Sequence, residues 1–255
     1  MPRYLAQVEY QGTAYRGWQI QPNESTIQGT IEAALARIFQ TQIPIAAPSR
    51  TDAGVHALAQ YFIFDSPQEF EPWLLRKSLN GLLPKDISII RTTKVAPDFE
   101  LRSRVKSKSY SYQIQQAPYR PAFNREFSWW IIAPLQLELI QEAMALLIGE
   151  HDFSAFRGQG CGSKNPVKRL YTANLTLEPI VEGNKVNFNF QGSGFVKHQI
   201  RLMVGGLVQL SRGKSNLAEF TAAIEEAKGL QFPLNAPAQG LTLEEIQLEP
   251  NPFEV

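Results

Sequence analysis

The sequence predicts an α+β fold, because strand-like and helix-like segments follow one another without the regular βαβ alternation of a Rossmann or barrel fold. Period-two alternation of apolar residues, typical of half-buried strands, runs through residues 4–10, 170–177 and 186–190, and further strands are expected at residues 60–64 and 87–95. Apolar residues recur every three to four positions, as on one face of a helix, in residues 25–38, 72–79, 135–148, 200–208 and 217–227. We expect a mixed, largely antiparallel sheet flanked by helices.

Several of these elements have recognisable ends. Ser25 and Gln28 have the spacing of a capping box, which predicts the start of the first helix. Pro72 is typical of the first turn of a helix, and Gly149 is typical of the position just after one. A further short strand is expected at residues 43–47, interrupted by Pro44.

The order of elements suggests two similar halves of ferredoxin-like character that meet near residue 105. Residues 1–105 would form an N-terminal half that carries the loop around Asp52. Residues 106–255 would form a C-terminal half that carries Tyr110 and Arg201.

Composition narrows the possible classes of protein. The sequence has no run of some twenty apolar residues and begins directly with a strand-like pattern, so we expect neither a membrane span nor a signal peptide, and a cytoplasmic location. Cys161 is the only cysteine, which excludes an internal disulfide. His56, His151 and His198 lie far apart without metal-ligand spacing, so no metal site is expected. The net charge is +1, so a polyanionic partner would need a local basic patch.

Residues 49–57 hold a single carboxylate, Asp52, among small residues. The guanidinium of Arg50 would favour the ionised form of Asp52, and Gly54 can adopt a positive φ. An ionised Asp in such a loop can act as a nucleophile or a base. The same residues equally suit a structural turn, since Asp often bonds the backbone two residues on. We interpret the neighbouring His56 as a structural histidine rather than a base.

A basic row follows in the even-numbered positions Arg102, Arg104, Lys106, Lys108, Tyr110 and Tyr112. An extended segment would place these side chains on one side. The cations could bind RNA. They could equally lie on a solvated edge strand, where Lys discourages the addition of another strand. Two successive aromatic side chains are not expected on a fully solvated face, so Tyr110 or Tyr112 is a candidate for lining a cleft.

Two further basic segments could contact phosphates. The glycine-rich residues 157–164 lack P-loop spacing, and we expect a mobile basic loop there, with Lys168 and Arg169 just beyond it. Lys197 and Arg201 would lie one helical turn apart near a helix start. A solvated basic face explains this pair equally well.

Taken together, these residues resemble the tRNA pseudouridine synthase A family, which isomerises uridines at positions 38 to 40 of the anticodon stem-loop. The resemblance rests on Tyr10-Gln11-Gly12, Gly17-Trp18-Gln19, residues 50–57, Lys108-Ser109-Tyr110-Ser111-Tyr112, residues 195–205 and Gly240-Leu241. These segments span nearly the whole chain in the order of the family.

The resemblance implies roles for individual residues. Asp52 would be the nucleophile, and Tyr110 would stack near the target base. Arg201 would pair with the catalytic carboxylate, and Arg50 would help to displace the base. Ser49 departs from the family, which usually has Gly there; if that position needs a positive φ, Ser49 would be strained by about 1 kcal/mol.

The resemblance also implies two subdomains with a basic cleft between them, a homodimer, tRNA as partner and no cofactor. Candidate RNA contacts are Arg50, Arg104, Lys106, Lys108, Tyr110, Lys168, Arg169 and Lys197. The reaction breaks the N1–C1′ bond and joins C5 to C1′ without redox change, so it needs a carboxylate, an aromatic platform and basic surface.

Three questions stay open at the level of sequence. Asp52 could attack the base or the sugar carbon, or abstract a ribose proton. A hydrolase with Asp52 as covalent nucleophile is an alternative, although it would want a metal or an oxyanion-hole motif, which we do not find. A non-catalytic RNA-binding protein of the same fold is the other alternative.

Overall fold

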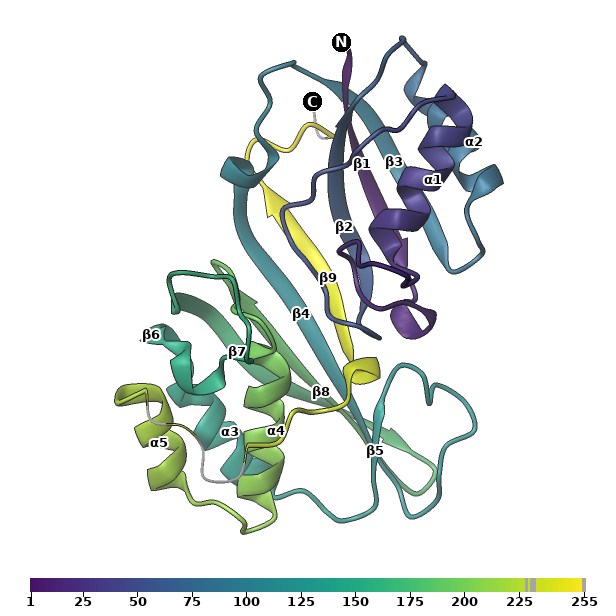
Figure 1. Cartoon of the computed structure of the whole chain (residues 1–255). Helices are drawn as coiled ribbons and strands as arrows, with labels where there is room; N and C mark the ends of the chain where they lie inside the picture. The colour runs from purple at the N-terminus through teal and green to yellow at the C-terminus, as the bar shows by residue number, and fades with distance from the viewer. Residues whose placement is uncertain (228, 230–232, 254–255) are drawn as a thin grey trace. The chain divides into compact units, whose positions relative to one another are not determined.

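The computed structural model describes residues 1–227, 229 and 233–253 (Figure 1). The predicted α+β class with a largely antiparallel sheet is confirmed. The chain forms two compact units, the first made of Met1–Lys106 and Leu243–Val255 and the second of Ser107–Thr242. Residues from Leu243 onward thus belong with the first unit, whereas the division predicted at residue 105 places them in the C-terminal half. The cleft expected between the halves stays a prediction.

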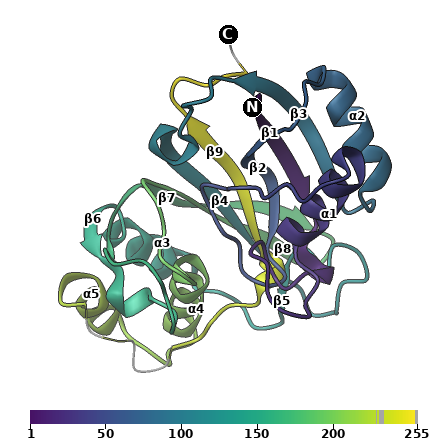
Figure 2. The same ribbon diagram turned by 45° about the horizontal axis from the view of Figure 1, so that its top comes forward.

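In the first unit, strand β1 (Arg3–Tyr10) lies between β2 (His56–Asp65) and β3 (Ile87–Val95) and is antiparallel to both. Strand β9 (Leu241–Leu248) follows β2 in the strand order. Helices α1 (Ile27–Phe39) and α2 (Pro72–Leu82) lie side by side against the sheet (Figures 1 and 2).

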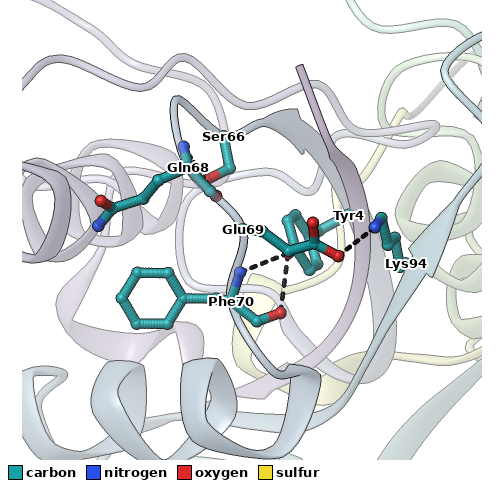
Figure 3. Close-up of polar contacts among 6 residues, drawn as sticks. All are labelled: Tyr4, Ser66, Gln68, Glu69, Phe70 and Lys94. Carbon is teal, nitrogen blue, oxygen red and sulfur yellow. Dashed lines mark hydrogen bonds and ion pairs between the residues drawn. The ribbon is translucent and has the colours of Figure 1, made fainter.

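Aromatic side chains fill the space between α1 and this sheet. Phe39 of α1 contacts Phe64 of β2, with ring centroids 6.4 Å apart, and Tyr4 of β1 stacks on Phe64 at 5.6 Å. The fully buried Tyr4 hydroxyl donates to the carbonyl of Phe70 and accepts from its N–H, each at 2.8 Å (Figure 3). Nearby, Lys94 forms an ion pair with Glu69. These contacts fix the segment that leads into α2.

Two sequence predictions fail locally. The cap of α1 is Thr26 rather than Ser25, because the Thr26 hydroxyl accepts the N–H of Gly29 at 3.2 Å. The strand expected at residues 43–47 reduces to one isolated bridge, Ala46 with Ile63. Because Pro44 has no N–H, it cannot donate a hydrogen bond to a neighbouring strand.

In the second unit, β8 (Gly183–Gly192) pairs antiparallel with β4 (Val105–Gln116) and with β7 (Val167–Ile180). Strand β6 (Gly149–Asp152) extends the sheet beyond β7, and the short β5 (Trp129–Ile131) pairs parallel with β4.

Helices α3 (Leu137–Leu146), α4 (Gln199–Ser211) and α5 (Leu217–Glu225) pack together in this unit (Figure 1). Along β8, Val186, Phe188 and Phe190 are buried. The residues between them are polar: Asn187 accepts from Gln113 at 3.0 Å, and Asn189 donates to Asn174 at 3.2 Å. The sheet therefore has one apolar and one polar face. None of the helices in the described ranges is both long and apolar enough to cross a membrane.

The cap of α1 gives a direct test. Thr26→Ala should lower the free energy of unfolding by about 0.5 to 2 kcal/mol, because the Gly29 N–H loses its partner. Ser25→Ala, the matched control one residue earlier, should change it by less than about 0.5 kcal/mol. Urea unfolding followed by circular dichroism measures both. A larger loss for Ser25→Ala would assign the cap to Ser25 after all.

Candidate active site

The Asp52 loop is held by the segment between β1 and α1. The N–H of Trp18 donates to the carbonyl of Thr51 at 3.1 Å, and the N–H of Gly54 donates to the carbonyl of Tyr15 at 3.2 Å. At the start of the segment, the Tyr10 hydroxyl lies 2.8 Å from the Thr51 hydroxyl. Three separate sequence motifs, around Tyr10, Trp18 and Asp52, thus form one local structure.

Two glycines let the two backbones approach this closely. A Cβ on Gly12, in the 3-10 turn η1 (Gly12–Ala14), would lie 2.0 Å from the carbonyl oxygen of Val55. Gly17 has a φ of +91°, and a Cβ there would lie 2.6 Å from the carbonyl oxygen of Thr51 and 3.0 Å from the carbonyl carbon of Asp52. Any other residue would push the loop away.

Asp52 begins a tight turn. Its carbonyl accepts the N–H of Val55 at 3.2 Å, and Gly54 has a φ of +80°, which suits the glycine position of a type II turn. The chain therefore does turn here, with Gly54 in the positive-φ conformation that glycine allows. Thr51 and Val55 are buried, whereas Asp52 is half-buried and Arg50 is exposed. The turn thus fixes the backbone, and Asp52 stays partly exposed to solvent.

Ser49 needs no unusual backbone. It is not among the residues with positive φ in the part of the chain that the structure describes. Its side chain is buried, and its carbonyl accepts from the amide of Gln60 at 3.2 Å. The strain considered for a residue other than Gly therefore does not arise.

His56 is structural, as expected from the sequence. It is 2% exposed, and its Nδ1 accepts the backbone N–H of Gly12 at 3.1 Å. An accepting Nδ1 carries no proton, so the other ring nitrogen bears it. His56 thus ties the end of the Asp52 loop to η1.

The row of cations predicted from Arg102 is not one strand. Arg102 and Arg104 lie in a 3-10 turn, η2 (Leu101–Arg104), and β4 begins only at Val105. The turn buries Leu101, and the Ser103 hydroxyl donates to the carbonyl of Glu100 at 2.8 Å, so local packing overrides the period-two pattern.

The cations of this row have different surroundings. The Arg104 guanidinium lies 5.9 Å from the centroid of the Phe99 ring, and exposed Lys106 forms a 2.8 Å ion pair with Glu249. Lys108 is half-buried in β4.

The two tyrosines of β4 are buried, so the solvated-edge interpretation does not apply to them. Tyr110 is 7% exposed and meets the ring of Phe195 edge-on, with centroids 5.2 Å apart. Tyr112 is fully buried and donates from its hydroxyl to the carbonyl of Pro237 at 2.7 Å. Tyr112 therefore does not line a cleft. The sequence marks Phe195 only as the start of the segment 195–205 and does not predict its contact with Tyr110.

Lys197 and Arg201 do not share a helical face, because α4 begins at Gln199 and its cap, His198, has a φ of +64°. This left-handed residue turns the chain between the two cations. Lys197 donates from its ammonium to the carbonyl of Gln159 at 3.0 Å, whereas the Nε of Arg201 donates to the carbonyl of Ala236 at 2.8 Å. Sequence patterns could not reveal Ala236, because only its backbone takes part.

The glycine-rich loop 157–164 packs against the residues before α4. Arg157 donates to the carbonyls of Cys161 and Ser163, and the N–H of Gly158 donates to the carbonyl of Lys197 at 2.8 Å. Burial acts to raise the pKa of the Cys161 thiol, but hydrogen bonds from neighbouring backbone N–H groups and the Arg157 guanidinium outweigh it and lower this pKa. Beyond the loop, Lys168 donates to the carbonyl of Asn165.

The candidate residues fall into both units. Asp52, Arg50, Arg104 and Lys106 belong to the first, and Lys108, Tyr110, Lys168, Arg169, Lys197 and Arg201 to the second. Within residues 1–227, 229 and 233–253, no group of three His, Cys, Asp or Glu side chains could hold a metal ion.

The sequence is similar to proteins of one family. A sequence model for tRNA pseudouridine synthase matches residues 6–104 and 143–248. The tRNA pseudouridine synthase A of Myxococcus xanthus is 38% identical over 246 residues, which cover 96% of this chain and 92% of that protein. Those of Geotalea uraniireducens and of an Exiguobacterium species are each 36% identical, over 94% and 98% of this chain and 96% and 99% of theirs.

A solved structure titled as a Cbf5-Nop10-Gar1 complex has a chain with 11% sequence identity and a TM-score of 0.37, over 81% of this chain and 54% of that one. At that TM-score the likeness adds nothing to the assignment.

The backbone clamp on Asp52 predicts a specific intolerance. Gly17→Ala should lower the free energy of unfolding by about 2 to 5 kcal/mol, since it combines an unfavourable φ with a clash against Thr51. Gly81→Ala is the matched control: a Cβ at Gly81, in α2, meets nothing within 4 Å, and Ala should stabilise the helix by up to about 1 kcal/mol. Thermal unfolding distinguishes them, and equal effects would contradict the clamp.

Proposed function

This chain belongs to the tRNA pseudouridine synthase family, and we propose that it isomerises uridines at positions 38 to 40 of the anticodon stem-loop with Asp52 as its nucleophile. It is an isomerase that acts on uridine in tRNA. The observation that carries the proposal is similarity over nearly the whole chain; the match to the family model over residues 6–104 includes the Asp52 loop.

The architecture of the Asp52 loop supports this role. Asp52 is the only carboxylate in residues 49–57, and hydrogen bonds to Tyr15 and Trp18 hold the backbone on both sides of it. A carboxylate on a fixed backbone loses little freedom when it meets a substrate, which favours the reacting geometry. The reaction breaks N1–C1′ and forms C5–C1′; the C5 hydrogen leaves as a proton and N1 gains one, so the atoms balance without a co-reactant.

We assign supporting roles to three residues. Tyr110 is the platform for a uracil flipped out of the RNA stack, and its edge-on contact with Phe195 fixes the plane of its ring. Arg201 pairs with the carboxylate of Asp52, and the exposed Arg50 helps to displace the base.

The RNA backbone is bound by cations. We propose Arg104, Lys106, Lys108, Lys168, Arg169 and Lys197 for this role, since Lys and Arg side chains neutralise phosphates. We also propose a homodimer in the cytoplasm, as the family resemblance implies.

Asp52→Asn separates chemistry from structure, because it keeps the volume of the side chain and removes only the charge. We expect near-normal stability and tRNA binding but no tritium release above background from 5-tritiated-uridine tRNA. Asp98→Asn, the same change at an exposed carboxylate of the first unit, should keep full activity. Wild-type protein should work fully in excess EDTA.

The assay also distinguishes the alternatives. Appreciable turnover by Asp52→Asn, or loss of wild-type activity in EDTA, would remove Asp52 from the centre of the reaction and favour the hydrolase. Binding of tRNA by a wild type that never releases tritium would indicate a non-catalytic RNA-binding protein.

Binding of phosphates by Arg104 and Lys106 would make the affinity for tRNA depend on salt. We expect Arg104→Ala or Lys106→Ala to reduce the slope of log affinity against log salt by about 0.7 to 0.9 for each phosphate that the variant no longer neutralises. Lys77→Ala, which removes an exposed cation from α2, is the control and should leave the slope unchanged. Filter binding at several salt concentrations measures this. Unchanged slopes in all three variants would make both residues solvated surface cations.

A further inference from the structure

Residues 233–240, which we call the strap, run along α4 in the second unit and end in the 3-10 turn η4 (Ala238–Gly240). At one end, a Cβ on Gly205 of α4 would lie 1.7 Å from the carbonyl oxygen of Leu234. The amide of Asn235 lies 3.3 Å from Nδ1 of His198 at the start of the helix. The strap therefore packs directly on the backbone of α4.

The middle of the strap makes two hydrogen bonds with Arg201. The N–H of Ala236 donates to the carbonyl of Arg201 at 3.1 Å, and the Nε of Arg201 donates to the carbonyl of Ala236 at 2.8 Å. Backbone and side chain of Arg201 are thus fixed by the same residue. A guanidinium fixed at Nε keeps its plane, so a displacement of Ala236 would turn the whole group.

Tyr112 of β4 holds the far end of the strap. Its hydroxyl donates to the carbonyl of Pro237 at 2.7 Å, next to the residue that holds Arg201. A Cβ on Gly240 would lie 2.6 Å from the Cζ of Tyr112, so the ring packs flush against the strap as well. Burial raises the pKa of Tyr112 more than the positive charge of Arg201 lowers it, so the hydroxyl keeps its proton and acts as a donor.

We propose that Tyr112 is a positioning residue for the isomerisation: through Pro237 and Ala236 it sets the orientation of the Arg201 guanidinium. The inference rests on the proposed pairing of Arg201 with Asp52. The expected contribution of Tyr112 is geometric, because a displacement of about 1 Å at a reacting group can cost on the order of 100-fold in rate.

Tyr112→Phe keeps the buried ring and removes only the hydroxyl. We expect kcat for tritium release to fall about 10- to 100-fold while KM for tRNA stays within about twofold, since no group that binds RNA is removed. Tyr4→Phe is the matched control, because Tyr4 is an equally buried tyrosine whose hydroxyl binds the backbone of Phe70 in the other unit (Figure 3). Tyr4→Phe should cost similar stability but leave kcat unchanged.

A double-mutant experiment with Arg201 distinguishes a positioning role of Tyr112 from a purely structural role. In an Arg201→Lys background, where the Nε donor to Ala236 is absent, Tyr112→Phe should lower the single-turnover rate by less than about threefold. An equal loss in both backgrounds, or a wild-type kcat for Tyr112→Phe, would overturn the inference.

Hydrogen exchange adds a measurement that does not require activity. The amide of Ala236 should exchange faster in Tyr112→Phe than in wild type or Tyr4→Phe, because the strap loses its hold next to it. Unchanged exchange would overturn the inference even if the rates fell. A wild type without tritium release would instead overturn the proposed function, and the exchange measurement would still decide whether Tyr112 holds the strap.

Discussion

The contact of two backbones without intervening side chains is the constraint on which the first unit's candidate site depends. Gly12 and Gly17 bring residues 10–18 against the Asp52 loop, and hydrogen bonds to Thr51 and from Gly54 use the backbone groups that this contact buries. Buried N–H and C=O groups are costly without partners, so the contact and the hydrogen bonds require each other. The position of Asp52 is therefore fixed by the end of β1 and by the segment between β1 and α1, not by the loop alone.

In the second unit, a buried polar group again has a backbone partner, but here the buried group belongs to a side chain. The hydroxyl of fully buried Tyr112 needs a partner, and the carbonyl of Pro237 supplies it. That bond fixes the strap, whose next residue toward the N-terminus, Ala236, exchanges two hydrogen bonds with Arg201. Hydrogen bonds to β4 and α4 therefore hold Ala236 and Pro237 in place.

The sequence predicted what depends on local periodicity and missed what depends on packing. The strands β1, β2, β3, β7 and β8 and the α-helices α1 to α5 of the described ranges were predicted, mostly because apolar residues with a period of 2 or 3.6 identify the element and its buried face. Ser25 and Thr26 have almost the same capping chemistry, so only the structure shows which hydroxyl meets Gly29. The alternation from Arg102 to Tyr112 could not reveal that its first part is a 3-10 turn and that its last part is buried, since neither follows from polarity along the chain.

For Asp52, the structural turn and the catalytic loop need not be alternatives. A turn that is closed by Asp52 and Val55, with glycine at the positive-φ position, is rigid because its geometry is over-determined by contacts outside it. Rigidity of that kind is what a nucleophile needs, because a freely moving carboxylate would lose conformational entropy in reaching its reactive position. The small side chains of Ala53 and Gly54 then leave room beside the carboxylate, which large residues would fill. The features that are typical of an ordinary turn are those that would suit this loop to chemistry.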